Sequence, residues 1–461
     1  MSELAFYTAR ELAPLIRACQ VSPVEVTNKL LERIQMFDPT FRSYITPLFD
    51  VALRQAKQAE KEIMQGVDRG PLHGIPIGIK DNKLTEGIRT TIGSKLFANF
   101  VPKETATIVT KLRQAGTIML GKQNMHQMAI GSTGTNPFYG ATKNPWNTHY
   151  MVGGSSSGAA ASLAAGLATL ATGTDTFGSI RLPAAMTGVY GLKTTYGRTS
   201  TYGVFPTAMS LDTVGPMARS VKDLAWMLQV MAGYDPNDPA SLHVQVPNYT
   251  AYFNKDIRGL KIGVPTYYLE DLDRDVAFLF ERALDTLQYI GAEIKEMVLP
   301  ELTLSTFAGY SIVVGEAAAF HEKWLKTQAE NYAPDTRATL FAGTLTHAPP
   351  YMKAQQARRK MASAFLKAFE KVDVLLGPTI PITTPAFQAN WVKQNLEVVR
   401  RTLPFTSPIN LTGTPALAVP MGLCSKGLPV GMQLIGPPLS EARLLQIGNV
   451  WEQTVPLSVR A

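Results

Sequence analysis

The sequence has few of the residues on which disulfide frameworks, metal clusters and histidine-based catalysis depend. It contains only two cysteines among 461 residues, Cys19 and Cys424. Because they lie at opposite ends of the chain, they supply neither a disulfide framework nor a metal cluster, and this usage favours a reducing, cytoplasmic setting. The six histidines show no metal-ligand spacing such as H-E-x-x-H. We therefore expect no metal and no other cofactor.

Charged residues are also scarce, at 17% against 45% hydrophobic residues, and this balance excludes a disordered chain. The net charge of +8 is spread thinly rather than gathered in runs of Lys and Arg, which argues against nucleic-acid binding. No segment matches the about 20 strongly apolar residues of a membrane helix. Residues 1–16 lack a basic region followed by a long apolar run. We expect no nucleic-acid partner, no membrane segment and no signal peptide.

Helix-like and strand-like patterns alternate along the chain. Residues 3–65 are expected to be helical, with Ser22 as an N-cap and Pro23 at the first position of a helix. Residues 75–79 have the period of two that is typical of a strand. A helix followed by a strand recurs at residues 105–122, 275–297 and 355–376. This alternation predicts an α/β fold in which helices cover the faces of a mixed sheet.

The chain shows no obvious boundary between domains. No fixed-period repeat is visible, and the stretch "YDPNDPASLHVQVPNY" is expected to be a surface excursion rather than a linker. We predict one domain over residues 1–461. Within it, a helical N-terminal segment, residues 1–65, wraps a catalytic α/β core, residues 66–461.

The stretch "GGSSSGAAA" contains a literal match to G-x-S-x-G, the pattern of a hydrolase nucleophile elbow, centred on Ser156. A nucleophile elbow follows a buried strand and needs a later histidine. The preceding segment, "ATKNPWNTHYMV", is polar and broken by Pro145, and the three later histidines lie in ordinary helices or loops. Ser156 is therefore not expected to be the nucleophile.

Several motifs occur in a characteristic order and spacing: "GPLHGIPIGIKDN", "GGSSSGAAASLAAG", "GTDTFGSIRLPAAMTGVYGLKTTYGR" and "PINLTGTPALAVPMGL". Together they resemble the amidase signature family, and the resemblance covers nearly the whole chain. It implies the amidase signature fold, a large mixed central β-sheet with helices on both faces.

The resemblance also implies a Ser–cis-Ser–Lys triad. Its lysine is Lys80 in "GIKDN", its middle serine, with a cis peptide bond, is Ser155, and its nucleophile is Ser179 in "FGSIR". The chemistry is coherent, because a serine hydroxyl is a weak nucleophile until a base takes its proton, and a neutral lysine can serve through a second hydroxyl. The lysine pKa, near 10.4, would have to fall by roughly three units, which costs about 4 kcal/mol if desolvation does it.

Acyl transfer needs donors for the oxyanion that forms on the attacked carbonyl. The resemblance assigns them to the backbone N–H groups of Thr176, Phe177, Gly178 and Ser179. Phe177 stands where the family usually has glycine. Its ring either points away from the site or forms a wall of the substrate pocket that favours flat or apolar acyl groups.

Further residues near the motifs are candidates for supporting roles. Met128, Gly154 and Phe177 are candidate substrate-pocket residues. Asp175 and Arg181 flank the nucleophile and are expected to form a structural pair that holds its loop. A part in proton chemistry is not expected for this pair, because arginine does not deprotonate in this range.

The leading hypothesis is a cofactor-free hydrolase that cleaves an amide bond, or a related anilide, carbamate or ester, through an acyl-enzyme. We expect a cytoplasmic monomer or homodimer acting on a small-molecule amide. The alternative is the glutaminase component of an aminoacyl-tRNA amidotransferase, its A subunit. Two departures weigh against it: His126 and Gln127 replace a usual Asp-Glu pair, and "TLPFTSPIN" lacks the usual acidic residue.

Overall fold

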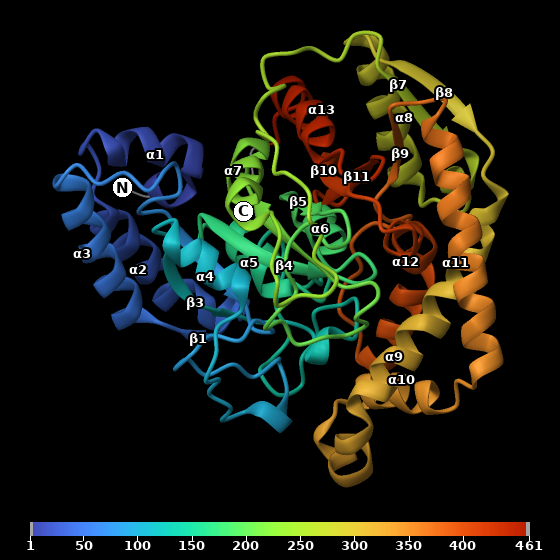
Figure 1. Cartoon of the computed structure of the whole chain (residues 1–461), viewed down its shortest axis with the longest axis horizontal. Coiled ribbons are helices and arrows are strands. Elements are labelled where there is room, and N and C mark those ends of the chain that lie inside the picture. Colours follow the sequence, from blue (N-terminus) through green and yellow to red (C-terminus); the bar gives the residue numbers. More distant parts are fainter. Residues whose placement is uncertain (1–2, 458–461) are drawn as a thin grey trace.

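A computed structural model describes residues 3–457, and its strands form one eleven-stranded sheet in the order β1-β3-β2-β4-β6-β5-β10-β11-β9-β7-β8 (Figure 1). The strands are β1 (Tyr44–Pro47), β2 (Pro76–Lys80), β3 (Ile118–Gln123), β4 (Leu170–Asp175), β5 (Tyr190–Lys193), β6 (Thr213–Ala218), β7 (Lys261–Pro265), β8 (Glu293–Met297), β9 (Val374–Pro378), β10 (Ala416–Leu423) and β11 (Pro429–Ile435). β2 is parallel to β3 and β4, and β7 is parallel to β8 and β9, whereas the other pairs are antiparallel. The predicted mixed sheet is confirmed.

Helices surround this sheet, with α1–α3 at one end of the molecule and α9–α12 at the other (Figure 1). The α-helices are α1 (Ala9–Arg17), α2 (Pro23–Phe41), α3 (Phe49–Met64), α4 (Thr107–Gln114), α5 (Ser157–Ala164), α6 (Arg181–Thr187), α7 (Val221–Met231), α8 (Arg274–Tyr289), α9 (Ser305–Gln328), α10 (Pro334–Thr344), α11 (Ala348–Phe369), α12 (Trp391–Thr412) and α13 (Glu441–Thr454). Short 3₁₀ helices are η1 (Glu3–Phe6), η2 (Lys95–Phe97), η3 (Gln127–Ala129), η4 (Thr266–Leu269), η5 (Pro300–Leu304) and η6 (Ala329–Asn331).

The N-terminal segment contains the expected helices and one strand that we did not expect. Ser22 caps α2 by accepting a hydrogen bond from the Val24 amide at 2.9 Å, as predicted. β1 lies between α2 and α3 and pairs with β3 at the edge of the sheet. The first 65 residues therefore extend the sheet as well as contributing helices.

β2 is buried along its whole length, so its alternating residues do not separate a core face from a solvent face. The Gln123 side chain on the neighbouring strand lies against Gly78, and a methyl group there would come within 1.8 Å of Gln123 Nε2 and displace that side chain. Cover on both faces is the usual environment of parallel strands. Lys80, the last residue of β2, consequently ends inside the protein.

The residues that follow β2 and β4 come together because these two strands are parallel neighbours. The carboxyl ends of parallel strands meet at one edge of a sheet, which is where open α/β sheets bind ligands. β4 leads into a short loop and then into α6, and the fully buried α5 packs beside α6. The same edge of the sheet thus receives Lys80 and the loop of residues 176–180.

One segment, Pro300–Asn331, is long and apolar enough to cross a membrane by composition alone. Half of its most apolar window is buried inside the protein, and α9 packs against α10, α11 and α12. One face of α9 therefore packs against the protein, while Phe307, Tyr310 and Phe320 are exposed on the other.

Candidate active site

Lys80 ends in a cage of hydroxyl groups. Its Nζ lies 2.8 Å from Ser155 Oγ, 2.9 Å from Ser156 Oγ and 2.7 Å from Thr174 Oγ1, and its side chain is fully buried. Among residues 3–457, no carboxylate forms an ion pair with this amine. Hydroxyl groups can accept from a lysine or donate to its lone pair, so the cage accommodates both the charged and the neutral amine.

Burial lowers the pKa of Lys80 to about 7, and the carboxylates of Asp175 and Asp212 oppose part of this effect. Desolvation disfavours the charged form of a lysine, and here it outweighs the attraction of the two acidic side chains. An uncharged amine is therefore populated at neutral pH. The predicted triad chemistry requires a deprotonated lysine, and this environment favours that form.

The three hydroxyl groups around Lys80 are not equivalent. Ser156 Oγ donates to the Thr174 carbonyl at 3.3 Å and accepts from the Thr174 amide at 3.3 Å, so its hydrogen is already committed. In the part of the chain that the structure describes, Ser155 Oγ makes no hydrogen bond except the one to Lys80. Ser155 is thus the hydroxyl that remains available to pass a proton.

The peptide bond between Gly154 and Ser155 is cis, as the resemblance implies. The Ser155 carbonyl accepts a hydrogen bond from the His126 amide at 3.2 Å. The Ser156 amide donates to the Ser179 carbonyl at 3.2 Å and so joins the two serine-bearing segments. No direct hydrogen bond links the Ser155 and Ser179 hydroxyls in residues 3–457; Ser179 is held beside the cage through the backbone.

The loop before Ser179 offers several backbone amides to a substrate. The amide of Gly178 donates to Asp175 Oδ1 at 2.7 Å, so this predicted oxyanion donor already has an acceptor. The amides of Thr176, Phe177 and Ser179 donate to no protein atom among the described residues. Three of the four predicted donors remain free for a developing negative charge.

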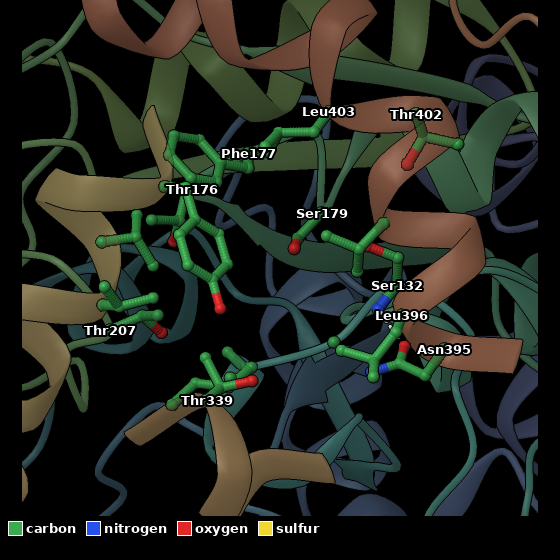
Figure 2. Close-up of a pocket in the computed structure, with 17 residues that line it drawn as sticks. Ser132, Thr176, Phe177, Ser179, Thr207, Thr339, Asn395, Leu396, Thr402 and Leu403 are labelled. Atoms are coloured by element: carbon green, nitrogen blue, oxygen red, sulfur yellow. Dashed lines mark hydrogen bonds between the residues drawn. The ribbon is translucent and has the colours of Figure 1, made fainter. Parts of the chain in front are cut away.

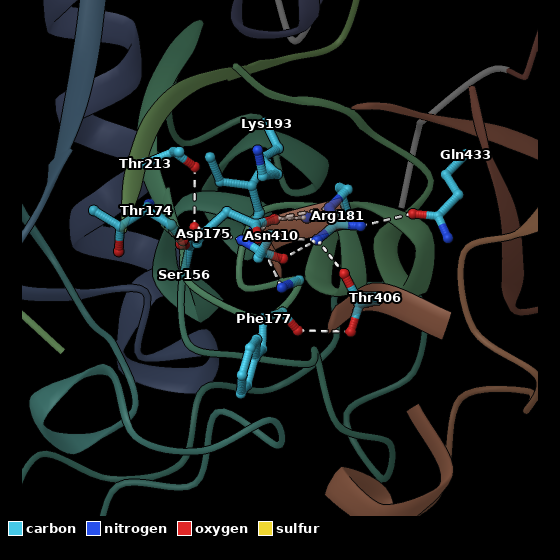
Figure 3. Close-up of polar contacts among 12 residues, drawn as sticks. Ser156, Thr174, Asp175, Phe177, Arg181, Lys193, Thr213, Thr406, Asn410 and Gln433 are labelled. Atoms are coloured by element: carbon cyan, nitrogen blue, oxygen red, sulfur yellow. Dashed lines mark hydrogen bonds and ion pairs between the residues drawn. The ribbon is translucent and has the colours of Figure 1, made fainter. Parts of the chain in front are cut away.

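A buried ion pair holds this loop in place (Figure 3). Arg181 contacts Asp175 through both Nε and Nη2 at 3.0 Å, and both side chains are fully buried. Asn410 donates to Asp175 and accepts from Arg181, while Gln433 accepts from Arg181 at 2.8 Å. Burial alone would raise the pKa of Asp175, but Arg181, the nearby amine of Lys193 and the hydrogen bond from Asn410 together outweigh it and hold that pKa well below its usual range.

A cavity opens directly beside Ser179, between its loop, the loop of residues 129–132 and helices α9, α10 and α12 (Figure 2). Its lining residues are Ala129, Ile130, Gly131, Ser132, Thr176, Phe177, Ser179, Thr207, Tyr310, Val313, Val314, Thr339, Asn395, Leu396, Val399, Thr402 and Leu403. None of them carries a charge, and most are apolar. The residues of this chain therefore favour a neutral, largely apolar group in the cavity.

Only one of the three predicted pocket residues lines this cavity. The ring of Phe177 forms part of its wall and packs against Gly309 of α9 (Figure 2). Met128 is fully buried in the hydrophobic cluster that includes Ile92. Gly154 packs against the backbone of the loop that carries Gly131, one layer behind the cavity surface.

His126 supports the cavity wall from behind. Its Nε2 lies 2.8 Å from Asp335 Oδ2, and Asn395 donates to the same carboxylate oxygen at 2.9 Å. Asn395 in turn accepts a hydrogen bond from the Ser132 amide at 3.0 Å. This fully buried cluster connects the 129–132 loop to α10 and α12.

Ser156 and Thr174 were not predicted to lie around Lys80, and the distant partners of the ion pair were not identified from the sequence. For Thr174 a signal existed, because Thr172 and Thr174 lie on one face of β4, whose other residues before Asp175 are apolar, beside Lys80. For Asn410 and Gln433 there was none. They reach Arg181 from positions more than 220 residues further along the chain.

Comparisons with known proteins agree along almost the entire chain. A family model described as Amidase matches residues 25–445. The chain is 41% identical to the A subunit of the glutamyl-tRNA(Gln) amidotransferase of Geobacter metallireducens over 98% of both chains, and 38% identical to the corresponding protein of Carboxydothermus hydrogenoformans over 98% of both.

Solved structures of similar proteins share the fold. A bacterial aryl acylamidase of the amidase signature family superposes with a TM-score of 0.89 at 26% identity, covering 98% of this chain and 96% of that one. The A subunit of the glutamyl-tRNA(Gln) amidotransferase from Thermotoga maritima superposes with a TM-score of 0.84 at 30% identity, with the same coverage.

These relatives overturn the predicted partners. We expected a monomer or homodimer that acts alone on a small-molecule amide, without a nucleic-acid partner, yet relatives matched over their full length are named as subunits of a glutamyl-tRNA(Gln) amidotransferase. That prediction is wrong. Composition and net charge describe the surface as a whole and do not reveal whether one part of it is a subunit interface.

Proposed function

The chain belongs to the amidase signature family, and on that premise we propose that it hydrolyses a carbon–nitrogen bond as the A subunit of an amidotransferase in the cytoplasm. The single observation that carries the chemistry is the fully buried Lys80 amine beside the Ser155 hydroxyl, which has no other hydrogen-bond partner among residues 3–457. The likeness to amidotransferase A subunits over the full chain length supports the assembly.

We assign the proton transfers as follows. Neutral Lys80 takes the hydroxyl proton of Ser155 while Ser155 takes that of Ser179, and Ser179 Oγ attacks the substrate carbonyl. The oxyanion that forms accepts from the free amides of the 176–179 loop. The proton returns by the same route to the leaving nitrogen, the C–N bond breaks, and water then cleaves the acyl-enzyme.

In this role the amide substrate is glutamine, and the product that leaves first is ammonia for transfer by the rest of the complex. Glutamine carries an α-ammonium and an α-carboxylate, and burying either without a partner is costly. Because the cavity lining of this chain has no charged side chain, the charges that hold glutamine would have to lie at the rim or on another protein of the complex.

A second candidate substrate is favoured by that same uncharged lining. A neutral aryl or short aliphatic amide, or a related anilide or carbamate, leaves no charge unpaired in the cavity and contacts Phe177 on its wall. In this alternative the chain keeps its place in an assembly, and only the acyl group differs. The likeness to an aryl acylamidase fits this substrate class.

Ammonia release separates the two substrates. The full chain would be isolated with any subunits that copurify from its host, and then tested on glutamine and on neutral amides such as benzamide and butyramide. Glutamine turnover that needs the copurifying subunits supports the amidotransferase role, and turnover of neutral amides alone supports the second candidate. Ser179→Ala is the matched control, and turnover that survives it would refute both.

A further inference from the structure

Lys83 is a second fully buried amine close to the hydroxyl cage around Lys80. Its Nζ lies 3.3 Å from both Asn82 Oδ1 and the Gly173 carbonyl oxygen. Among residues 3–457, no carboxylate comes within 4.0 Å of it. Burial, together with the nearby amines of Lys80 and Lys122, lowers the pKa of Lys83 well below its usual value. An apolar side chain would occupy this position without that cost.

A chain of three hydrogen bonds, through Asn82 and Thr174, connects Lys83 to the amine of Lys80. Asn82 accepts from Lys83 through Oδ1 and donates through Nδ2 to Thr174 Oγ1 at 3.2 Å. Thr174 Oγ1 lies 2.7 Å from Lys80 Nζ. The main-chain carbonyl of Gly173 can only accept, so Lys83 donates there, and its remaining N–H groups keep the amide oxygen of Asn82 turned toward it.

This orientation matters because an amide is a dipole. With its oxygen held by Lys83, Asn82 presents the positive N–H₂ end to the Thr174–Lys80 contact. A positive end beside an amine disfavours the ammonium form. If the amide turned over, its oxygen would face the cage and favour the ammonium form. When Lys83 is charged, it also disfavours the ammonium form of Lys80, as the N–H₂ end of Asn82 does.

We propose that Lys83 is a positioning residue for Lys80: it fixes the Asn82 amide so that Lys80 stays uncharged and able to take the Ser155 proton. This role rests on the proposed function of Lys80. The other titratable groups around the two amines are Asp175, Asp212, Lys122 and the Lys122 partner Asp81, and a substitution at Lys83 leaves all four residues in the chain.

The test is the pH dependence with which a fluorophosphonate labels Ser179 in the full-length Lys83→Met variant. We expect the acid limb of the curve of labelling rate against pH to shift to higher pH by about 0.5–1 unit, because a hydrogen bond of ordinary strength is lost. At pH 6 the variant should label roughly three- to tenfold more slowly than wild type, and at pH 9.5 the two rates should agree.

Two more variants make the result specific. Asn82→Ala should move the limb in the same direction, and the Lys83→Met/Asn82→Ala double variant should move it no further than the larger single shift. Lys111→Met is the matched control, because Lys111 also donates to buried main-chain carbonyls, those of Met231 and Ala232, far from the cage. Its limb should coincide with that of wild type.

An unmoved limb in Lys83→Met, or a uniform loss of rate at all pH values, would overturn the positioning role while leaving the proposed function intact. If Lys83→Met does not fold, an unmoved limb in Asn82→Ala overturns it equally. A limb that persists in Lys80→Met would instead refute the proposed function, and the role of Lys83 with it.

Discussion

The pH dependence of Ser179 reactivity follows directly from the environment of Lys80. Burial lowers the pKa of Lys80 to about 7, and only the neutral amine can accept a proton. The neutral fraction is about one half at pH 7, roughly one in eleven at pH 6 and about 1% at pH 5. The rate constant for acylation should therefore fall about tenfold for each pH unit below 7 and become constant above about pH 8.

A fluorophosphonate reports this rate without requiring knowledge of the substrate, because it reacts with any activated serine. The second-order labelling rate would be measured between pH 5 and 9.5, with intact mass confirming one modification per chain. Ser179→Ala should not be labelled. Lys80→Met should be labelled slowly, at a rate that does not change through pH 7, since its Met side chain does not titrate.

Two outcomes would refute the reasoning. A wild-type rate that is constant from pH 5 to 9 would mean that Lys80 does not gate the nucleophile. A midpoint near the ordinary lysine pKa, about 10.4, would mean that burial does not deprotonate it. Either result would remove the base from the proposed mechanism, whatever the substrate.

Three further predictions concern the same site. In Lys80→Met, the unfolding free energy should rise less steeply with pH between 7 and 10 than in wild type, by up to about 1.4 kcal/mol per pH unit. The reason is that Lys80 of the unfolded wild-type chain binds a proton in this window and folded Lys80 does not. Urea titrations at pH 8 and 9.5 that give both proteins the same change in unfolding free energy would contradict this. Ser155→Ala should reduce turnover about 10²- to 10⁴-fold. Ser156→Ala removes an acceptor of Lys80 and two hydrogen bonds to the Thr174 main chain, but not the relay, and should cost about tenfold or less; equal losses in kcat would count against Ser155 as the relay. Arg181→Met should lower the unfolding free energy at pH 7 by about 3–5 kcal/mol, because the Asp175 carboxylate stays buried without its ion pair. A change below about 1 kcal/mol in a denaturant titration would show that the pair does not hold the loop.

Local patterns were sufficient for the class of fold. The alternation of helix and strand signals predicted the mixed sheet, and the pairs α4–β3, α8–β8 and α11–β9 lie where it indicated. The cap of α2 was readable because Ser22 and Pro23 act on the adjacent turn alone. The edge strand β1 was missed, since its pairing with β3 joins residues about 75 positions apart.

The residue types of the candidate site were also determined by the sequence, whose ordered motifs singled out Lys80, Ser155 and Ser179. Their chemical state was decided by tertiary structure. Lysine deprotonation depends on complete burial, and burial depends on packing over both faces of β2. The choice of Ser155 over Ser156 as relay depends on which hydroxyl hydrogen is already committed to Thr174.

Neither the cavity nor the assembly could be predicted from a linear sequence pattern. The cavity wall combines side chains of α9, α10 and α12 with loops that lie about 100–275 positions earlier in the chain, so that no short window contains its uncharged lining. A subunit interface is likewise a surface property that net charge averages away. Sequence alone thus determined which groups could react, while three-dimensional packing decided their protonation, their orientation and the space left for a substrate, because each of these depends on contacts between distant parts of the chain.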